Sequence, residues 1–132
     1  MTKPFIICLI DDDDIYQFTF TKGLKGSNVA KKILVFSDGE EAMDFMIDNV
    51  ANTEALPDVI FLDINMPIMD GWQFLDEIVK IPTSKKVTIY IVSSSIDPMD
   101  LKKAKQYSVV TNYLIKPMTI ANLEKVVNSI EI

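Results

Sequence analysis

Five short apolar runs, separated by longer amphipathic segments, constrain the fold of this chain more than any other feature of its sequence. Such alternation is typical of successive strand–helix units, which build a parallel sheet with helices on both faces. The runs are apolar almost throughout, rather than at every second position, as expected of strands that are buried on both sides. We therefore predict strands at about 5–10, 32–36, 58–62, 87–92 and 111–115.

The segments between these runs have the spacing of helices that bury one face. The last segment, for example, places Ile120, Leu123 and Val127 on one stripe. We predict helices at about 14–25, 38–49, 71–80, 98–107 and 119–130, with Asp38 and Thr119 as candidate caps. Because strand–helix–strand crossovers are right-handed, these units favour an α/β fold with a single doubly wound sheet of five parallel strands and five helices. In such sheets, ligands bind outside the carboxyl ends of the strands.

Length and composition indicate the class of protein. The 132 residues match the usual size of one compact domain, which we place at 1–132, and 48% hydrophobic with 24% charged residues is ordinary for a globular chain. No apolar run approaches the ~20 residues that cross a bilayer, and the first run is too short for a signal peptide. We therefore expect a cytoplasmic protein without membrane contact. The single cysteine, Cys8, lies within the first run and is expected in the core.

Net charge and the lack of histidine exclude several functions. The formal net charge of −6 argues against binding to nucleic acid, which requires basic side chains to neutralise phosphates. The absence of histidine removes Ser-His and Cys-His nucleophiles and histidine metal ligands. Any phosphohistidine chemistry must therefore be supplied by another protein.

Polar side chains follow the predicted strands directly. Asp11 and Asp12 come after the first strand and Asp63 after the third, while Ser93 and Lys116 follow the fourth and fifth. Because the carboxyl ends of parallel strands meet at one edge of a sheet, these side chains should share a cleft. Asp63 is the most informative, since an aspartate that ends an apolar strand has no turn or cap role that would explain it.

Carboxylates in such a cleft suit Mg²⁺ and a phosphoryl group. Mg²⁺ prefers oxygen ligands, which Asp12, Asp63 and the main-chain oxygen of Asn65 could supply, while Asp11 could hold a metal-bound water. A carboxylate oxygen of Asp63 could then attack phosphorus and form an acyl phosphate. The turn residues at 70–71 would shape the loop that aims this aspartate into the cleft.

Phosphoryl transfer also needs charge neutralisation around the phosphoryl oxygens, which Lys116 and Ser93 could supply. Taken alone, each feature also has a plainer explanation. The acidic run at 11–14 could be solvated helix caps, the hydroxyl run at 93–95 a polar loop, and Lys116 a solvated lysine. Only their combination in one cleft favours the chemical interpretation.

The order and spacing of these residues resemble the receiver domain of two-component response regulators over essentially the whole chain. The resemblance is carried by the acid pair at 11–12, Asp63 within the run FLDINMPIMDG, Ser93 thirty residues later, and Lys116 followed by proline. Each motif is modest alone, whereas their order and spacing together are specific. The resemblance implies a flavodoxin-like sheet with strand order 2-1-3-4-5.

The resemblance also implies a role for each residue at this edge of the sheet. These roles are phosphoacceptor (Asp63), Mg²⁺ ligands (Asp11, Asp12, Asp63 and Asn65), phosphate-binding ammonium (Lys116), switch hydroxyl and aromatic (Ser93 and Tyr113), and positions that tune phosphate loss (Asn65 and Ser95). In the switch, the Ser93 hydroxyl would move toward a phosphoryl oxygen, and Tyr113 would turn inward into the space that it leaves.

The implied function is phosphorelay signalling. The domain would take a phosphoryl group from a histidine kinase or histidine phosphotransfer protein onto Asp63, and would catalyse only its own phosphorylation and dephosphorylation. Its fourth helix, fifth strand and fifth helix would then bind a downstream protein or, on phosphorylation, a second copy of the chain. The chain ends at Ile132 with no output segment, so we expect either a stand-alone regulator or an excised receiver from a larger protein.

Two other functions fit parts of the pattern. A Mg²⁺-dependent phosphatase of the haloacid-dehalogenase type also uses an aspartate nucleophile on an α/β sheet. However, the residue two positions after Asp63 is Asn65 rather than the second carboxylate of such enzymes, and there is no cap domain. A receiver-like scaffold could instead bind partners without being phosphorylated. Stable phosphoryl-Asp63 would separate a receiver from both alternatives.

Overall fold

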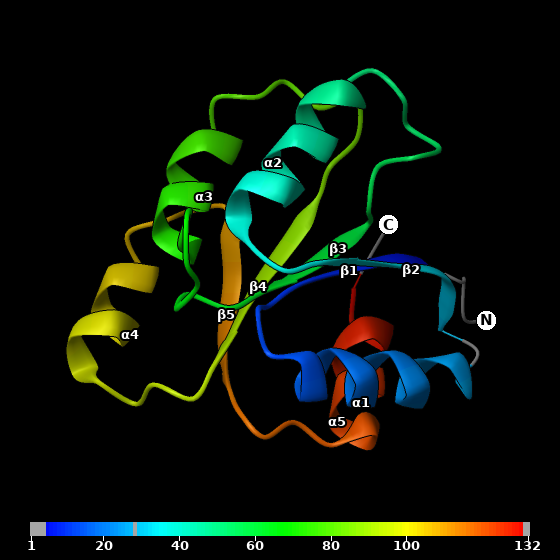
Figure 1. Cartoon of the computed structure of the whole chain (residues 1–132), viewed down its shortest axis with the longest axis vertical. Helices are drawn as coiled ribbons and strands as arrows, with labels where there is room; N and C mark the ends of the chain where they lie inside the picture. Colours follow the sequence, from blue (N-terminus) through cyan, green and yellow to red (C-terminus); the bar gives the residue numbers. More distant parts are fainter. Residues whose placement is uncertain (1–4, 28, 131–132) are drawn as a thin grey trace.

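The computed structural model describes residues 5–27 and 29–130, which form one five-stranded sheet flanked by helices (Figure 1). Strands and helices alternate along the chain, as the sequence predicts. In chain order they are β1 (Phe5–Ile10), α1 (Asp14–Lys25), β2 (Ala30–Phe36), α2 (Gly39–Asp48), β3 (Val59–Leu62), α3 (Gly71–Ile78), β4 (Thr88–Ser93), α4 (Pro98–Ala104), β5 (Val110–Ile115) and α5 (Ile120–Asn128).

All strands of the sheet are parallel, in the order β2-β1-β3-β4-β5. The predicted fold class and strand order are therefore confirmed. The chain starts in the interior of the sheet, adds β2 on one side and then crosses to β3 on the other. The carboxyl ends of β1 and β3 consequently lie side by side where the direction of winding reverses, which is where open sheets of this kind bind ligands.

Two hydrophobic cores lie on opposite faces of the sheet. α1 and α5 cover one face, while α2, α3 and α4 cover the other (Figure 1). Successive side chains of a strand point to opposite faces. In β1, Ile7 and Leu9 therefore pack with α1 and α5, whereas Cys8 and Ile10 pack with the helices of the other face. The burial of Cys8 agrees with its predicted place in the core.

The two edge strands are less buried than the three central ones. Every residue of β1 and β3 is buried, whereas β2 exposes Lys31 and Lys32. β2 begins at Ala30, earlier than the predicted start at about 32. The two lysines interrupt the apolar pattern, but an edge strand tolerates them because one side of it faces water.

Side chains at the N-termini of the helices determine where those helices begin. Asp38 accepts a hydrogen bond from the Glu41 N–H at 2.9 Å, and Thr119 accepts one from the Asn122 N–H at 3.1 Å, so both predicted caps are confirmed. α1 ends at 25, as predicted. Other helices end earlier than predicted: α3 ends at 78 rather than about 80, α4 at 104 rather than about 107, and α5 at 128 rather than about 130. None of the helices in the described residues is long and apolar enough to cross a membrane.

Candidate functional site

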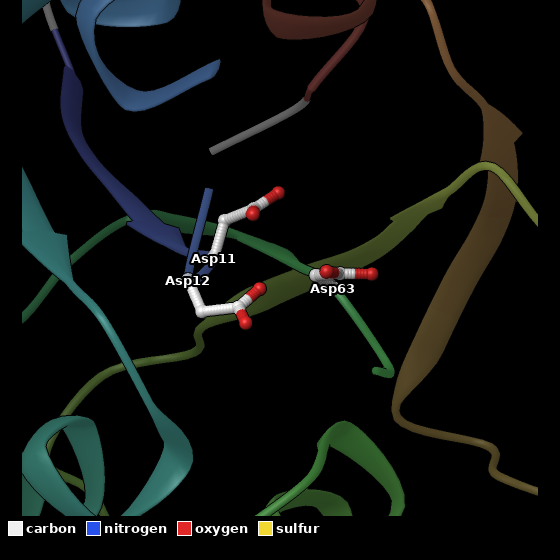
Figure 2. Close-up of side chains that lie close together, drawn as sticks. All are labelled: Asp11, Asp12 and Asp63. Carbon is white, nitrogen blue, oxygen red and sulfur yellow. The ribbon is translucent and has the colours of Figure 1, made fainter. Parts of the chain in front are cut away.

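Three carboxylates meet at the carboxyl edge of the sheet (Figure 2). Asp11 and Asp12 follow β1, and Asp63 follows β3. The contact between these strands continues past their ends, because the Asp63 N–H donates to the carbonyl oxygen of Ile10 at 2.9 Å. One oxygen from each carboxylate lies within 4.8 Å of the other two. Asp11 is 1% exposed and Asp63 8%, whereas Asp12 is open to solvent.

The loop after Asp63 is held by main-chain contacts. The Gly71 N–H donates to the carbonyl oxygen of Ile64 at 3.1 Å, and the Asn65 N–H donates to Oδ1 of Asp63 at 3.4 Å. A Cβ atom at Gly71 would lie 2.5 Å from the carbonyl oxygen of Asp63, so only glycine lets α3 begin this close to the aspartate. Asp70 caps the start of α3. Residues 70–71, which were predicted to shape this loop, therefore form the start of α3, and their contacts support the main chain that carries Asp63.

Lys116 reaches the same place from the end of β5. Its Nζ donates to Oδ2 of Asp11 at 2.6 Å and lies 3.9 Å from Oδ2 of Asp63. Its main-chain N–H donates to the carbonyl oxygen of Ser93 at 2.9 Å, which extends the contact between β4 and β5 by one residue. The peptide bond between Lys116 and Pro117 is cis. One ammonium group thus faces two buried carboxylates.

The electrostatics of the site favour a bound cation. Burial raises the pKa of Asp63 to about 6; the Lys116 ammonium opposes this shift, and the negative charge of Asp11 adds to it. Positive charge close to these groups would offset the cost of burying them. A cavity of about 330 Å³, lined in part by Asp12 and Asn65, lies at this edge. Because Mg²⁺ prefers oxygen ligands and keeps several waters, the carboxylates and the open cavity fit this ion.

Ser93, Ser95 and Tyr113 are joined in a chain of contacts beside the carboxylates. In the pairing of β3 with β4, Leu62 lies opposite Ile91. Asp63 is therefore level with Val92, and the buried Ser93 lies one residue further along the sheet edge. Oγ of Ser93 accepts a hydrogen bond from the Ser95 N–H at 3.1 Å, and the Tyr113 hydroxyl donates to the carbonyl oxygen of Ser95 at 2.9 Å. The two predicted switch residues therefore share one loop residue as a partner.

Two aromatic side chains at the site were not identified from the sequence. Tyr16, in the first turn of α1, has its ring centroid 4.3 Å from Nζ of Lys116. Burial raises the pKa of Tyr16 to about 12, and the negative charges of Asp11 and Asp63 contribute to the rise. Trp72, in the first turn of α3, lines the cavity described above. Their positions in the sequence could have indicated a place at the site, since each aromatic lies in the first turn of a helix that follows a site aspartate.

Comparison with known proteins agrees with this fold and this site. The family profile described as response regulator receiver domain matches residues 7–128. A two-component response regulator from Cytophaga hutchinsonii is 30% identical, with a TM-score of 0.83 over 96% of both chains. The phosphorylated cyanobacterial phytochrome response regulator RcpA is 27% identical, with a TM-score of 0.77 over 96% of this chain and 90% of the other. The Mn²⁺-bound form of response regulator Rcp1 is 28% identical, with a TM-score of 0.75 over 97% and 92% of the respective chains.

The chain therefore belongs to the response regulator receiver domain family of two-component signalling. Its acidic pocket, formed by Asp11, Asp12 and Asp63, is consistent with a phosphoacceptor. Membership of a two-component family implies a histidine kinase as partner, and receiver domains are in general not enzymes acting on other substrates.

Proposed function

We propose that this chain is a Mg²⁺-dependent phosphoacceptor whose Asp63 takes a phosphoryl group from a phosphohistidine of a partner protein. The observation that carries the proposal is the setting of the Asp63 carboxylate, which is buried beside two further carboxylates and lies 3.9 Å from the Lys116 ammonium. Phosphoryl transfer is served mainly by positioning and charge neutralisation, for which this setting is suited. The relatives crystallised in phosphorylated and Mn²⁺-bound forms support both parts of the proposal.

The transfer forms one bond to phosphorus and breaks another. An oxygen of the ionised Asp63 carboxylate attacks phosphorus while the P–N bond to the partner's imidazole breaks, and the electron pair of that bond returns to the imidazole nitrogen. Lys116 neutralises negative charge on the phosphoryl oxygens, and the Ser93 hydroxyl donates a hydrogen bond to one of them. The chain itself catalyses only this reaction and the later hydrolysis of its own acyl phosphate.

The metal ligands are oxygen atoms at the ends of β1 and β3. Asp12 and Asp63, with the main-chain oxygen of Asn65, would hold Mg²⁺ directly, and Asp11 would hold a water of the ion. The bound ion supplies positive charge to the phosphoryl oxygens. Asp11 already pairs with the Lys116 ammonium, which fits a contact with the ion through water rather than a direct one.

The switch proposed for this site uses the loop between β4 and α4. When the Ser93 hydroxyl turns to a phosphoryl oxygen, it gives up the hydrogen bond from the Ser95 N–H. Ser95 also accepts from Tyr113 through its carbonyl oxygen and donates to Asp100 of α4 through its hydroxyl at 2.6 Å. A shift at Ser93 therefore changes the loop, the tyrosine and the start of α4 together. Asn65 and Ser95, which flank this centre, would tune the loss of phosphate.

The partners follow from this chemistry. A histidine kinase or histidine phosphotransfer protein supplies the phosphoryl group, and α4, β5 and α5 form the readout surface for a downstream protein or a phosphorylation-dependent second copy. We further propose that residues 1–132 act as one cytoplasmic receiver domain that binds neither nucleic acid nor membrane. The phosphatase alternative gains no support, because an exposed amide, Asn65, stands where such enzymes have a carboxylate.

The test is phosphorylation by acetyl phosphate in the presence of Mg²⁺, followed by intact mass. The wild type should gain one phosphoryl group that hydroxylamine removes, as expected of an acyl phosphate. Asp63→Asn should gain none, whereas Asp44→Asn, which changes an exposed carboxylate of α2, should behave as the wild type. Incorporation that persists in Asp63→Asn, or its absence from the wild type, would contradict the assignment.

A further inference from the structure

Tyr16 and Lys116 are in direct contact although they come from α1 and from the end of β5. The ring centroid of Tyr16 lies 4.3 Å from Nζ of Lys116, within the ~6 Å over which a cation and an aromatic face attract each other. The Lys116 side chain is only 17% exposed. The attraction is therefore little weakened by water, and it is stronger than that of an exposed pair.

The contact restrains an ammonium group that lies at different distances from two carboxylates. Nζ of Lys116 lies 2.6 Å from Oδ2 of Asp11 but 3.9 Å from Oδ2 of Asp63, the residue that is proposed to accept the phosphoryl group. A lysine side chain is flexible, so its place in the pocket depends on what surrounds it. The tyrosine ring supplies an apolar and electron-rich face on which the ammonium can remain as its hydrogen bonds change from a carboxylate to a phosphoryl oxygen.

Tyr16 is itself held in place by packing. Its ring lies 6.0 Å from that of Phe20, and it packs against the hydrophobic core under α1 and α5. Its buried hydroxyl has no hydrogen-bond partner among the described residues. The contact that Tyr16 makes at the site is therefore that of its ring.

We propose that Tyr16 is a positioning residue for phosphoryl transfer, whose ring holds the Lys116 ammonium where it neutralises charge on a phosphoryl group at Asp63. This inference rests on the proposed function of Asp63. It adds a determinant of the reaction rate from α1, outside the residues that carry the family resemblance.

Two substitutions separate the ring of Tyr16 from its hydroxyl. Tyr16→Phe keeps the ring and should keep the rate constant for phosphorylation by acetyl phosphate at saturating Mg²⁺ within about twofold of the wild type. Tyr16→Leu removes the aromatic face and should lower that rate constant roughly five- to tenfold. The Mg²⁺ concentration that gives half the maximal rate should change less than about twofold in both variants, because Tyr16 contributes no oxygen to the ion.

A matched control comes from the same helix. Phe18 is 66% exposed and has Nζ of Lys22 5.6 Å from its ring centroid, and among the described residues Lys22 forms no ion pair with Asp11 or Asp63. Phe18→Leu, which removes an aromatic face near a lysine, should leave the phosphorylation rate unchanged. A slowing equal to that of Tyr16→Leu would show a general effect of altering α1 and would overturn the inference.

A measurement on the metal-free protein tests the contact without phosphorylation. Urea unfolding of the wild type, Tyr16→Leu, Lys116→Met and the double variant forms a double-mutant cycle. Lys116→Met should shift the unfolding midpoint by a different amount in the Tyr16→Leu background, since the cation–ring contact is already lost there. Strictly additive shifts would overturn the inference, whether or not the variants are active.

The outcomes distinguish this inference from the proposed function. A wild type that incorporates no phosphoryl group would contradict the proposed function, while the unfolding cycle would still test the contact between Tyr16 and Lys116. A wild type that incorporates phosphate as fast as Tyr16→Leu would overturn the positioning role alone. A Tyr16→Phe variant as slow as Tyr16→Leu would also overturn it, because the hydroxyl rather than the ring would then set the rate.

Discussion

Asp63 combines a buried carboxylate with both attractive and repulsive charges nearby. The Lys116 ammonium stabilises its ionised form, whereas burial and the negative charge of Asp11 favour its protonated form. Burial is the largest of these effects, which places the pKa at about 6. The phosphoacceptor role proposed for Asp63 requires its ionised form. A nearby cation would stabilise that form and offset the cost of burying the carboxylate.

This raised pKa predicts a pH dependence of stability in EDTA, where no divalent ion is bound. The carboxyl of Asp63 titrates near 6 in the folded state and near its ordinary 3.8 in the unfolded chain. Between these values the folded state binds more protons, so the contribution of Asp63 to the free energy of unfolding falls as pH rises. Asp63→Asn cannot ionise and should lack this fall.

Urea unfolding at several pH values measures the effect. The stability of Asp63→Asn minus that of the wild type should grow from about pH 4 to about pH 6 and then level off, by roughly 1 to 3 kcal/mol in total. A difference that is constant across this range, or that shrinks with rising pH, would show that the carboxyl is not destabilised by its surroundings.

Among the elements, α3 connects the cleft with the end of α4. Trp72 lines the cavity beside Asp12, and its ring lies 5.8 Å from that of Tyr107, which follows α4. Nζ of Lys103 lies 4.8 Å from the Trp72 ring, and the Tyr107 hydroxyl donates to Asp76 of α3 at 2.7 Å. These contacts offer a second route from the cleft to α4, beside the one proposed above through the loop after β4.

The position of Trp72 predicts an optical signal for metal binding. It is the chain's single tryptophan, so all tryptophan emission comes from this one side chain, which lines the cavity. Titration with Mg²⁺ should change the emission in a saturable way, with a midpoint equal to the dissociation constant from calorimetry. Asp12→Asn should shift both midpoints to higher Mg²⁺, whereas Asp44→Asn should shift neither. An emission unaffected by Mg²⁺ that calorimetry shows to bind would contradict this placement of the site.

The helices also show which boundaries local sequence determines. Helix starts are marked by short-range caps, such as Asp38 and Thr119, and both were predicted correctly. The ends of α4 and α5 were predicted too late, by about two or three residues. Residues 105–107 continue an acceptable helical sequence, but the chain must leave the helix there to enter β5, and packing rather than propensity sets that point.

At the scale of the whole molecule, the two cores meet across the central strands of one sheet. Cys8 lies within β1 and packs with the core on the α2 and α3 face. Burial raises the pKa of its thiol, and the thiolate is the reactive form. Reaction at Cys8 therefore requires the sheet itself to open.

This burial predicts that thiol modification reports global stability. Native protein should react with iodoacetamide only through its unfolded fraction, whereas protein in concentrated urea should react at once. Mg²⁺ at ten times its dissociation constant should slow native labelling about tenfold, because it stabilises only the folded state. Asp63→Asn, which removes a proposed Mg²⁺ ligand, should show a smaller effect at the same Mg²⁺ concentration. Rapid labelling of the native wild type would contradict the burial of Cys8.

The sequence by itself determined the alternating elements, the parallel sheet and the edge at which the site forms, because strand periodicity and helix caps depend on residues close together in the chain. The particular carboxylates that are buried, the pairing of Lys116 with Asp11 across 105 residues, and the contacts of Tyr16 and Trp72 were decided only by the tertiary structure. Those contacts join residues from different elements, and the distance between elements depends on how whole cores pack, which local patterns do not contain.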